Sequence, residues 1–307
     1  MVERASFTRL TGMTFSSYHI EKLLEQHPWG PVFLARGRNE IRYMIRFIET
    51  SSSETRSEAA PADRIVFLGR FQQEANLLAA LQHPHILPLL DYGVFHAMPY
   101  LVYPYSELVS LRTVLSQQGN TDLFAVSHYL EGIAAALEYA HDRAVLHRNL
   151  STKCLYLQPN RRLVIAEFGL LRIIQLSRQG AGAGGDGSDG TQKWQSYDGS
   201  SESSAPEQLL GKNVDKYTDI YAMGAVLYRM LTGHAPFEGK THEEVARQHL
   251  YAIQPPLKTW RPGLPVDIDH IITKALSKEP QHRFQRPGDF VRAYQEIIFT
   301  MEVDRNS

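Results

Sequence analysis

The stretch that decides the fold runs from Ala144 to Leu170 and reads AVLHRNLSTKCLYLQPNRRLVIAEFGL. Two short apolar runs, Leu155–Leu157 and Leu163–Ala166, flank a Pro-Asn turn, which is typical of a small β-hairpin. Triplets that include polar side chains stand at both ends of this hairpin, His-Arg-Asn at 147–149 and Glu-Phe-Gly at 167–169. The stretch therefore predicts a hairpin that carries polar groups over one cleft.

This layout resembles the catalytic loop and the metal-binding turn of protein kinases, whose signatures are H-R-D-L-x-x-x-N and D-F-G. Here the same frame reads H-R-N-L-S-T-K-C and E-F-G. In the family, phosphoryl transfer needs metal ions to stabilise charge and an Asp that accepts the proton of the attacking hydroxyl. The frame is kept, and its chemical groups are changed.

Four positions of this frame carry altered groups. Asn149 stands at the catalytic Asp, and a carboxamide takes up no proton at neutral pH, whereas losing a positioned base typically costs roughly 10²–10⁴ in rate. Cys154 stands where an Asn would hold the second metal ion, and a thiol is a poor ligand for hard Mg²⁺. Ser151 replaces the Lys common in Ser/Thr kinases, and Glu167 offers a carboxylate one methylene too long for near-ideal octahedral geometry. Together the four changes predict a chain that does not transfer phosphate.

The phosphate-covering loop and its neighbours are altered in a similar way. Of the three glycines in the family's G-x-G-x-x-G-x-V loop only Gly30 survives, and Glu25 puts a negative charge where phosphates would lie. Arg46 stands at the lysine of the V-A-I-K strand. Its expected partner is Glu74, in a stretch of helical periodicity that resembles the C-helix, because Arg pairs well with carboxylate.

The positions that would surround adenine carry large side chains. The resemblance places Val32, Met44 and Tyr156 around the adenine ring, Tyr103 at the gatekeeper and Tyr105 in the hinge. Met44 and Tyr156 would fill the slot from above and below, and overpacking typically costs roughly 1–3 kcal/mol. In the alternative, flexible Met and Tyr side chains rotate outward and leave the slot open. We expect a slot filled by protein.

A further set of positions matches the internal framework of the family. Asp219 falls where the family keeps its anchoring Asp, and A-P-E ends at Glu207, whose expected partner is Arg283. All members of the apolar column that joins the two lobes are compatible with packing. Those members are Leu78, Leu89, His147 and Phe168.

The resemblance implies an α+β, two-lobed protein-kinase-like fold. In the C-lobe the sequence motifs most resemble those of bacterial Hanks-type Ser/Thr kinases. It predicts a small β-rich N-lobe with one C-helix and a larger, mainly helical C-lobe. Segments 50–64 and 180–190 are expected to be flexible. The expected boundaries are a flexible arm at 1–17, a kinase-like domain at 18–298 (N-lobe 18–103, hinge about 104–107, C-lobe 108–298) and a tail at 299–307.

The composition and the apolar pattern of the sequence limit the cellular location and the classes of binding partner that we expect. A net charge of −1 gives no sign of a nucleic-acid surface, and a single cysteine excludes an intrachain disulfide and a multi-thiolate zinc site. The sequence has no signal-peptide pattern at its start and no apolar run near the roughly 18 residues of a spanning helix. We expect a cytoplasmic protein without membrane insertion.

Three functions remain open at this point. The first is a pseudokinase that signals or scaffolds by binding protein partners, such as an active kinase or its substrate, and needs no cofactor. The second is a Ser/Thr kinase with residual or atypical activity, and the third is a switch that senses nucleotide without turnover. ATP and Mg²⁺ are expected only under these two alternatives.

Overall fold

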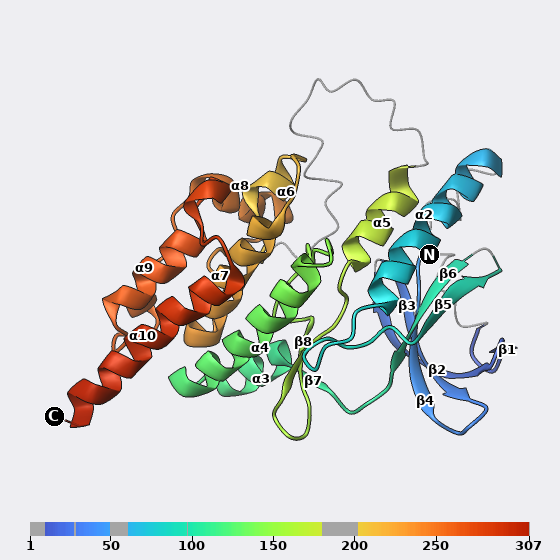
Figure 1. Cartoon of the computed structure of the whole chain (residues 1–307), viewed down its shortest axis with the longest axis horizontal. Helices are drawn as coiled ribbons and strands as arrows, with labels where there is room; N and C mark the ends of the chain where they lie inside the picture. The colour runs from blue at the N-terminus through green and yellow to red at the C-terminus, as the bar shows by residue number, and fades with distance from the viewer. Residues whose placement is uncertain (1–9, 28, 50–60, 97, 180–201, 307) are drawn as a thin grey trace. The chain divides into compact units, whose positions relative to one another are not determined.

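The structure is a computed structural model that describes residues 10–27, 29–49, 61–96, 98–179 and 202–306. These residues form two compact units (Figure 1). The first unit holds the described residues of 10–82, 87–107 and 172–179, and the second holds 83–86, 108–171 and 202–306. The two units correspond to the β-rich and the helical lobe that the sequence predicts.

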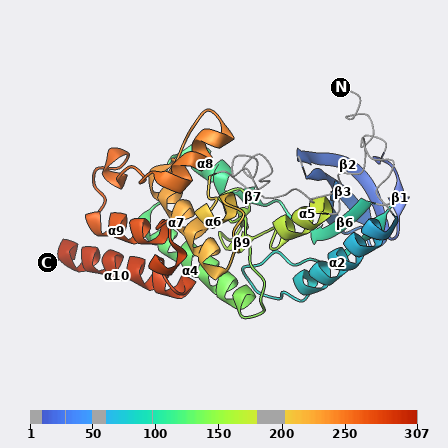
Figure 2. The same ribbon diagram turned by 90° about the horizontal axis from the view of Figure 1, so that it is seen from above.

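The first unit is built on an antiparallel six-stranded sheet with strand order β1-β2-β3-β4-β6-β5. Helices α2 (Pro61–Ala79) and α5 (Leu170–Gln179) lie side by side in both views (Figures 1 and 2). Pro61 opens α2 at a position where a missing backbone N–H costs nothing. The strands are β1 (Thr14–Phe15), β2 (Tyr18–His27), β3 (Gly30–Gly37), β4 (Arg42–Phe47), β5 (Asp91–Phe95) and β6 (Met98–Pro104).

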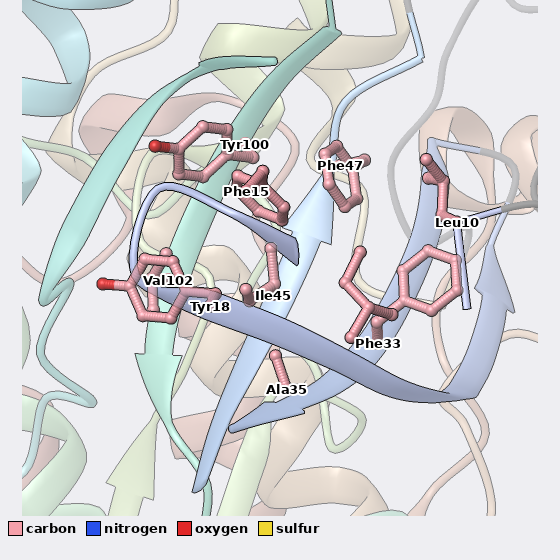
Figure 3. Close-up of a cluster of buried hydrophobic side chains, with 10 residues drawn as sticks. Leu10, Phe15, Tyr18, Phe33, Ala35, Ile45, Phe47, Tyr100 and Val102 are labelled. Atoms are coloured by element: carbon pink, nitrogen blue, oxygen red, sulfur yellow. The ribbon is translucent and has the colours of Figure 1, made fainter. Parts of the chain in front are cut away.

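Aromatic side chains dominate the core on one face of this sheet (Figure 3). The Phe15 ring stacks on Phe95 at 4.6 Å and meets Tyr100 edge-on at 5.0 Å between ring centroids. The prediction of a flexible arm at 1–17 is therefore wrong for residues 10–17, because Leu10 and Phe15 are buried and β1 pairs with β2. Burying one such apolar side chain contributes roughly 1.5–3 kcal/mol. The buried cluster is Leu10, Phe15, Tyr18, Ile20, Phe33, Ala35, Ile45, Phe47, Tyr100 and Val102.

The second unit is mainly helical and surrounds α7, whose side chains are buried along nearly its whole length. Asp215 caps the start of α7 by accepting from the Tyr217 N–H, and Gly233, at φ +81°, ends it. The predicted hairpin is present as β8 (Leu155–Leu157) and β9 (Leu163–Ile165), with β7 (Val109–Ser110) beside β8. The helices are α3 (Leu111–Gln118), α4 (Leu123–His141), α6 (Pro206–Leu209), α7 (Lys216–Thr232), α8 (His242–Tyr251), α9 (Val266–Ala275) and α10 (Pro287–Asn306), with 3₁₀ turns η1 (Leu257–Thr259) and η2 (Pro280–His282).

The bounds of two predicted segments differ from the structure. Helix α10 continues to Asn306, so residues 299–306 are not a separate tail, and α2 includes residues 61–64 of the predicted loop. Residues 50–60 and the Gly-rich centre at 180–190 lie outside the described residues. None of the helices in the described ranges has the length and apolar character needed to cross a membrane.

Candidate functional site

Asp219 organises the loop that follows α4. Its side chain is fully buried and accepts hydrogen bonds from the backbone N–H groups of His147 at 2.9 Å and Arg148 at 2.8 Å. A third bond joins its Oδ2 to His141 Nε2 at 2.8 Å. Burial pushes the pKa of Asp219 up, but the bond to His141 and the nearby imidazoles outweigh burial and lower the pKa. Asp219 is therefore an ionised group that fixes the loop through its backbone N–H groups.

Arg148 holds a strained backbone conformation within this loop. Its φ is +67°, in the left-handed region, which costs a non-glycine residue on the order of 1–3 kcal/mol. Two neighbours oppose this cost, since Asp219 accepts from the Arg148 N–H and Gln208 Nε2 donates to its carbonyl at 2.7 Å. The loop shape is thus imposed by the helices around it.

His147 and Phe168, two of the four expected column members, pack together. Their ring centroids are 4.7 Å apart, and His147 Nε2 lies 3.0 Å from the Ala166 carbonyl oxygen. Burial lowers the pKa of His147, so the ring is neutral, and its Nδ1 accepts from the Asn149 N–H at 3.3 Å. Nε2 therefore carries the proton that bonds Ala166. The other two members, Leu78 and Leu89, are buried and belong to the first unit.

Cys154 is closed into the loop. Its Sγ lies 3.1 Å from the Ser151 carbonyl oxygen and accepts from the Ser151 N–H at 3.2 Å. The side chain is only 2% exposed, and burial raises the pKa of the thiol to about 12. Ser151 is itself buried. Cys154 is therefore a neutral structural group rather than a thiolate ligand.

Glu207 and Arg283 are brought together as a buried ion pair. The guanidinium donates both Nη1 and Nη2 to the Glu207 carboxylate at 2.8 Å, and Thr218 Oγ1 adds a bond at 2.7 Å. Arg283 Nε also donates to the Ser277 carbonyl at 2.8 Å. Burial raises the pKa of Glu207, but the Arg283 hydrogen bonds and charge outweigh burial and lower it. The pair joins the start of α6 to the segment before α10.

Gly30 is required by packing within the first unit. Its φ is +122°, and a Cβ added there would lie 2.1 Å from the Phe47 carbonyl oxygen. The β2–β3 pairing extends to His27 opposite Gly30, with Glu25 opposite Val32. The surviving glycine is thus explained by the close approach of β3 to the backbone at Phe47.

The expected adenine positions of the first unit lie on adjacent strands. Met44 pairs with Tyr103 across β4 and β6, and Val32 pairs with Arg46 across β3 and β4. Val32, Arg46 and Tyr103 are buried, whereas Met44 is only partly buried. The Tyr105 N–H donates to the Arg42 carbonyl at 3.3 Å and extends the pairing beyond β6. Tyr156 lies on β8 of the second unit.

Glu74 pairs with a residue that the sequence analysis did not consider. Arg172 Nε on α5 donates to Glu74 Oε1 at 2.8 Å, so the structure pairs Glu74 with Arg172 instead of the expected Arg46. Helix α5 presents an apolar side, with Ile173, Ile174 and Leu176 buried. Its residues from 172 onward belong to the first unit, although the sequence placed them in the C-lobe.

The comparisons with known proteins agree with this architecture. The model of the protein kinase domain matches residues 18–293. This chain belongs to the protein kinase family. Among curated kinases, the Bacillus subtilis serine/threonine-protein kinase PrkC is 30% identical over 223 residues, 73% of this chain and 33% of the relative. Mycobacterium tuberculosis PknF is 29% identical over 292 residues, 92% of this chain and 56% of the relative.

The kinase fold is also found among solved structures. The kinase domain of M. tuberculosis PknI, crystallised as a double mutant, superposes with a TM-score of 0.68 at 24% identity. The match covers 93% of this chain and 97% of the PknI chain. At this identity the match establishes the fold alone. The chain spans between a third and just over half of the length of the curated kinases named above.

The metal positions of the kinase family are only partly retained here. Mg²⁺ prefers several oxygen ligands in near-ideal octahedral geometry. Cys154 offers a neutral, internally bonded thiol in place of an oxygen. Glu167, at φ +67°, supplies the one carboxylate of this set. These residues do not fit the two-metal arrangement of active kinases.

Several functional contacts of this kinase domain escaped sequence reasoning. His141, Gln208 and Arg172 each bond a residue that the motifs had singled out, namely Asp219, Arg148 and Glu74. His141 ends α4, but nothing in the sequence pattern shows which side chain a helix end will meet. The spacing of apolar residues in LLRIIQL, from Leu170 to Leu176, is the signal that could have predicted α5 as an amphipathic helix.

Proposed function

We propose that this kinase domain is a binding module that does not transfer phosphate. The observation that carries the proposal is the composition of the loop around Asn149. The Asn149 carboxamide occupies the position of the family's catalytic base, and the neutral thiol of Cys154 occupies the position of a metal ligand. Proton transfer needs a group that takes up the proton within hydrogen-bond reach, and a carboxamide does not. The module signals through the surfaces that its fold presents to protein partners.

The framework of the domain supports this proposal from a second side. Asp219, the His147–Phe168 contact and the Glu207–Arg283 pair all hold the fold in its family form. A chain that keeps these contacts while its reactive groups differ is suited to present a shaped surface. One fold carries many functions, so the function of this domain depends on the groups at its site.

A second candidate is a Ser/Thr protein kinase with atypical activity. The observation that favours it is that the similar curated proteins are named serine/threonine-protein kinases, one of them matched over 92% of this chain. Glu167 retains a carboxylate and Arg46 a cation at positions where the family uses both. Under this candidate ATP and Mg²⁺ are cofactors.

A phosphotransfer assay separates the two candidates. The purified protein is incubated with labelled ATP and Mg²⁺ or Mn²⁺, alone and with a basic protein substrate, beside a Glu167→Ala variant. We expect no incorporation above that of Glu167→Ala. Metal-dependent incorporation that disappears in Glu167→Ala would contradict the binding-module proposal and establish the kinase.

A thermal-shift titration tests nucleotide binding separately. We expect ATP at millimolar concentration to leave the melting curve nearly unmoved, because the sequence puts the large side chains of Met44 and Tyr156 at positions that line adenine in the family, and the negative charge of Glu25 at the phosphate loop. A ligand stabilises the folded state by RT ln(1 + [L]/Kd), so a weak ligand produces almost no shift. The double variant Met44→Ala with Tyr156→Leu is expected to gain a shift. A clear shift of the unaltered protein well below millimolar ATP would identify a nucleotide sensor instead.

A further inference from the structure

Two arginines and one glutamate form an ionic cluster beside the catalytic loop, apart from the site described above. Arg229 Nη1 on α7 donates to Glu202 Oε2 at 3.2 Å, and Arg112 Nη2 on α3 donates to the other oxygen, Glu202 Oε1. All three side chains are mostly covered, with exposed fractions of 28% for Arg112, 18% for Arg229 and 22% for Glu202. In this cluster two partly buried guanidinium groups therefore share one carboxylate of the same chain.

The cluster is tied to the loop that carries Asn149. The Arg112 N–H donates to the Thr152 carbonyl at 2.9 Å, and Ser203, which follows Glu202, donates its hydroxyl to the Leu150 carbonyl at 2.5 Å. The Arg112 backbone and the residue after Glu202 are thus hydrogen-bonded to residues within three positions of Asn149. An anion bound at this cluster would lie beside the loop that handles phosphate in active kinases.

The charges of the cluster are not balanced. Two guanidinium groups share one carboxylate, which leaves a formal charge of +1 in a partly buried place. Burial and then the charge of Arg229 lower the pKa of Arg112 to about 10, and burial lowers the pKa of Arg229. The carboxylate of Glu238 favours the charge of Arg229, but it also bonds the Ala235 N–H at 3.1 Å and lies 3.4 Å from His234. A second negative charge would be stabilised here.

Three buried polar atoms, two in the cluster and one in Thr152 beside it, are left without a partner among the described residues. Among the residues that the structure describes, Arg112 Nε, Arg229 Nε and Thr152 Oγ1 have no hydrogen-bond partner. An unsatisfied buried donor costs on the order of 1–3 kcal/mol, so each such atom in a native structure needs an explanation. Two of the three are guanidinium donors, which select acceptor oxygens such as those of a phosphate.

The space beside Glu202 is small. The cavity lined by Ser151, Thr152, Glu202, Ser203 and Arg229, with apolar residues of α7 and the following turn, holds about 10 Å³. That volume admits no more than about one water molecule. Another anion would have to displace the Glu202 carboxylate, so the two compete for the same arginines.

We propose that Arg112 and Arg229 form a docking site for a phosphorylated serine or threonine of a protein partner, whose phosphate takes the place of the Glu202 carboxylate. A phosphoryl group carries ≈ −1.5 to −2 charges at neutral pH and three acceptor oxygens, which match two guanidinium groups and their unsatisfied donors. This proposal deepens the proposed function by naming the partner chemistry. It is independent of whether phosphate is transferred, since the phosphorylated residue is held and not formed.

Fluorescence anisotropy with a labelled peptide of Ala and Gly around one phosphoserine tests the site, with the Ser and Glu forms of the peptide beside it. We expect the phosphoserine form to bind at least about tenfold more tightly than the other two. Arg112→Gln and Arg229→Gln are each expected to weaken binding by about tenfold or more. Glu202→Ala is expected to tighten it by about tenfold, because it removes the competing group. Arg247→Gln, an arginine of α8 that is 71% exposed, is the matched control and is expected to change nothing.

Several results would overturn the proposal. Glu202→Ala that leaves affinity unchanged or weaker would show that Glu202 does not compete. Equal loss in Arg247→Gln would show general charge attraction, and inorganic phosphate that binds as tightly as the phosphopeptide would show a site for the free ion. If either arginine variant fails to fold, which circular dichroism would reveal, the Glu202→Ala result alone decides. Detection of phosphotransfer would contradict the proposed function but would leave all of these binding readouts in place.

Discussion

The Glu207–Arg283 pair and the Cys154 loop are both buried parts of the second unit, and they differ in charge and in the distance along the chain that their contacts span. Arg283 donates to the Glu207 carboxylate, and to carbonyl oxygens of Ser277, Tyr217 and Lys278, at 2.8 to 3.1 Å. Cys154 makes weak sulfur contacts, of which the bond to the Asn149 carbonyl is 3.7 Å long. The first is a charge network that joins distant segments, and the second is a neutral local closure.

The difference explains which motif residues this chain keeps. Removing Glu207 or Arg283 would leave an uncompensated charge in the interior, which is strongly destabilising. A polar ligand replaced by a small neutral group that finds local partners, as Cys154 does, leaves no such charge. The fold therefore constrains the framework residues tightly and leaves the reactive positions open to change.

Breaking the framework pair is expected to have the largest effect. Glu207→Ala leaves the buried guanidinium of Arg283 without its carboxylate, and we expect a loss of about 3–5 kcal/mol in the free energy of unfolding. Urea denaturation followed by circular dichroism measures it. The matched control is Glu243→Ala, whose pair with Arg247 is 74% and 71% exposed and is expected to contribute no more than about 1 kcal/mol. Equal losses in both variants would remove the contrast between framework and surface.

Acid is expected to weaken the same framework. The pKa values of Glu207 and Asp219 are lowered in the folded state, so ionisation of these groups stabilises the fold. That stability is fully present above their unfolded pKa of about 4 and is lost as pH falls through the lower folded values. The urea concentration at the midpoint of unfolding is measured from neutral pH downward. We expect this concentration to decrease once the pH is below ~4. In Glu207→Gln this fall is expected to be shallower, and an unchanged profile would contradict the assignment.

The Cys154 thiol is expected to be unreactive in the folded protein. Its pKa of about 12, raised by burial, leaves very little thiolate at pH ~8, where an ordinary thiol is substantially ionised. Labelling by an aromatic disulfide reagent is therefore expected to be slower in the native protein than in denaturing urea by at least about a hundredfold. Comparable rates in both conditions would show an open loop. Because Cys154 is the one cysteine of the sequence, no other thiol contributes.

The smallest effect is expected at Glu74. Its partner Arg172 is 45% exposed, and pairs of this kind contribute about 0–1 kcal/mol. Glu74→Gln is expected to change the free energy of unfolding by less than about 1 kcal/mol, with faster amide exchange confined to α2 and α5. Arg70→Gln, one turn earlier on α2, is the control. A loss of several kcal/mol in Glu74→Gln would mean that Glu74 has a buried partner, as the sequence analysis expected.

Motif spacing predicted the architecture and much of the framework. The frame from His147 to Gly169 placed the β8–β9 hairpin correctly, and A-P-E with a distant Arg brought Glu207 and Arg283 together. Motif spacing is predictive here because the buried polar groups of this loop need hydrogen-bond partners, and the anchoring residues of the motifs supply them. The filled adenine slot and the absence of phosphotransfer stay predictions.

Other contacts were decided by the tertiary structure alone. The partner of Glu74, the third bond of Asp219 from His141, and the burial of Leu10 and Phe15 join residues that no local pattern connects. Periodicity shows that a segment has an apolar side, as in α5, but not which surface receives it. The amino-acid sequence by itself determined the kinase frame and the altered reactive groups, because these are properties of residue type and spacing. The tertiary structure decided the pairing of charges and apolar faces, because these depend on which distant segments close packing brings within reach.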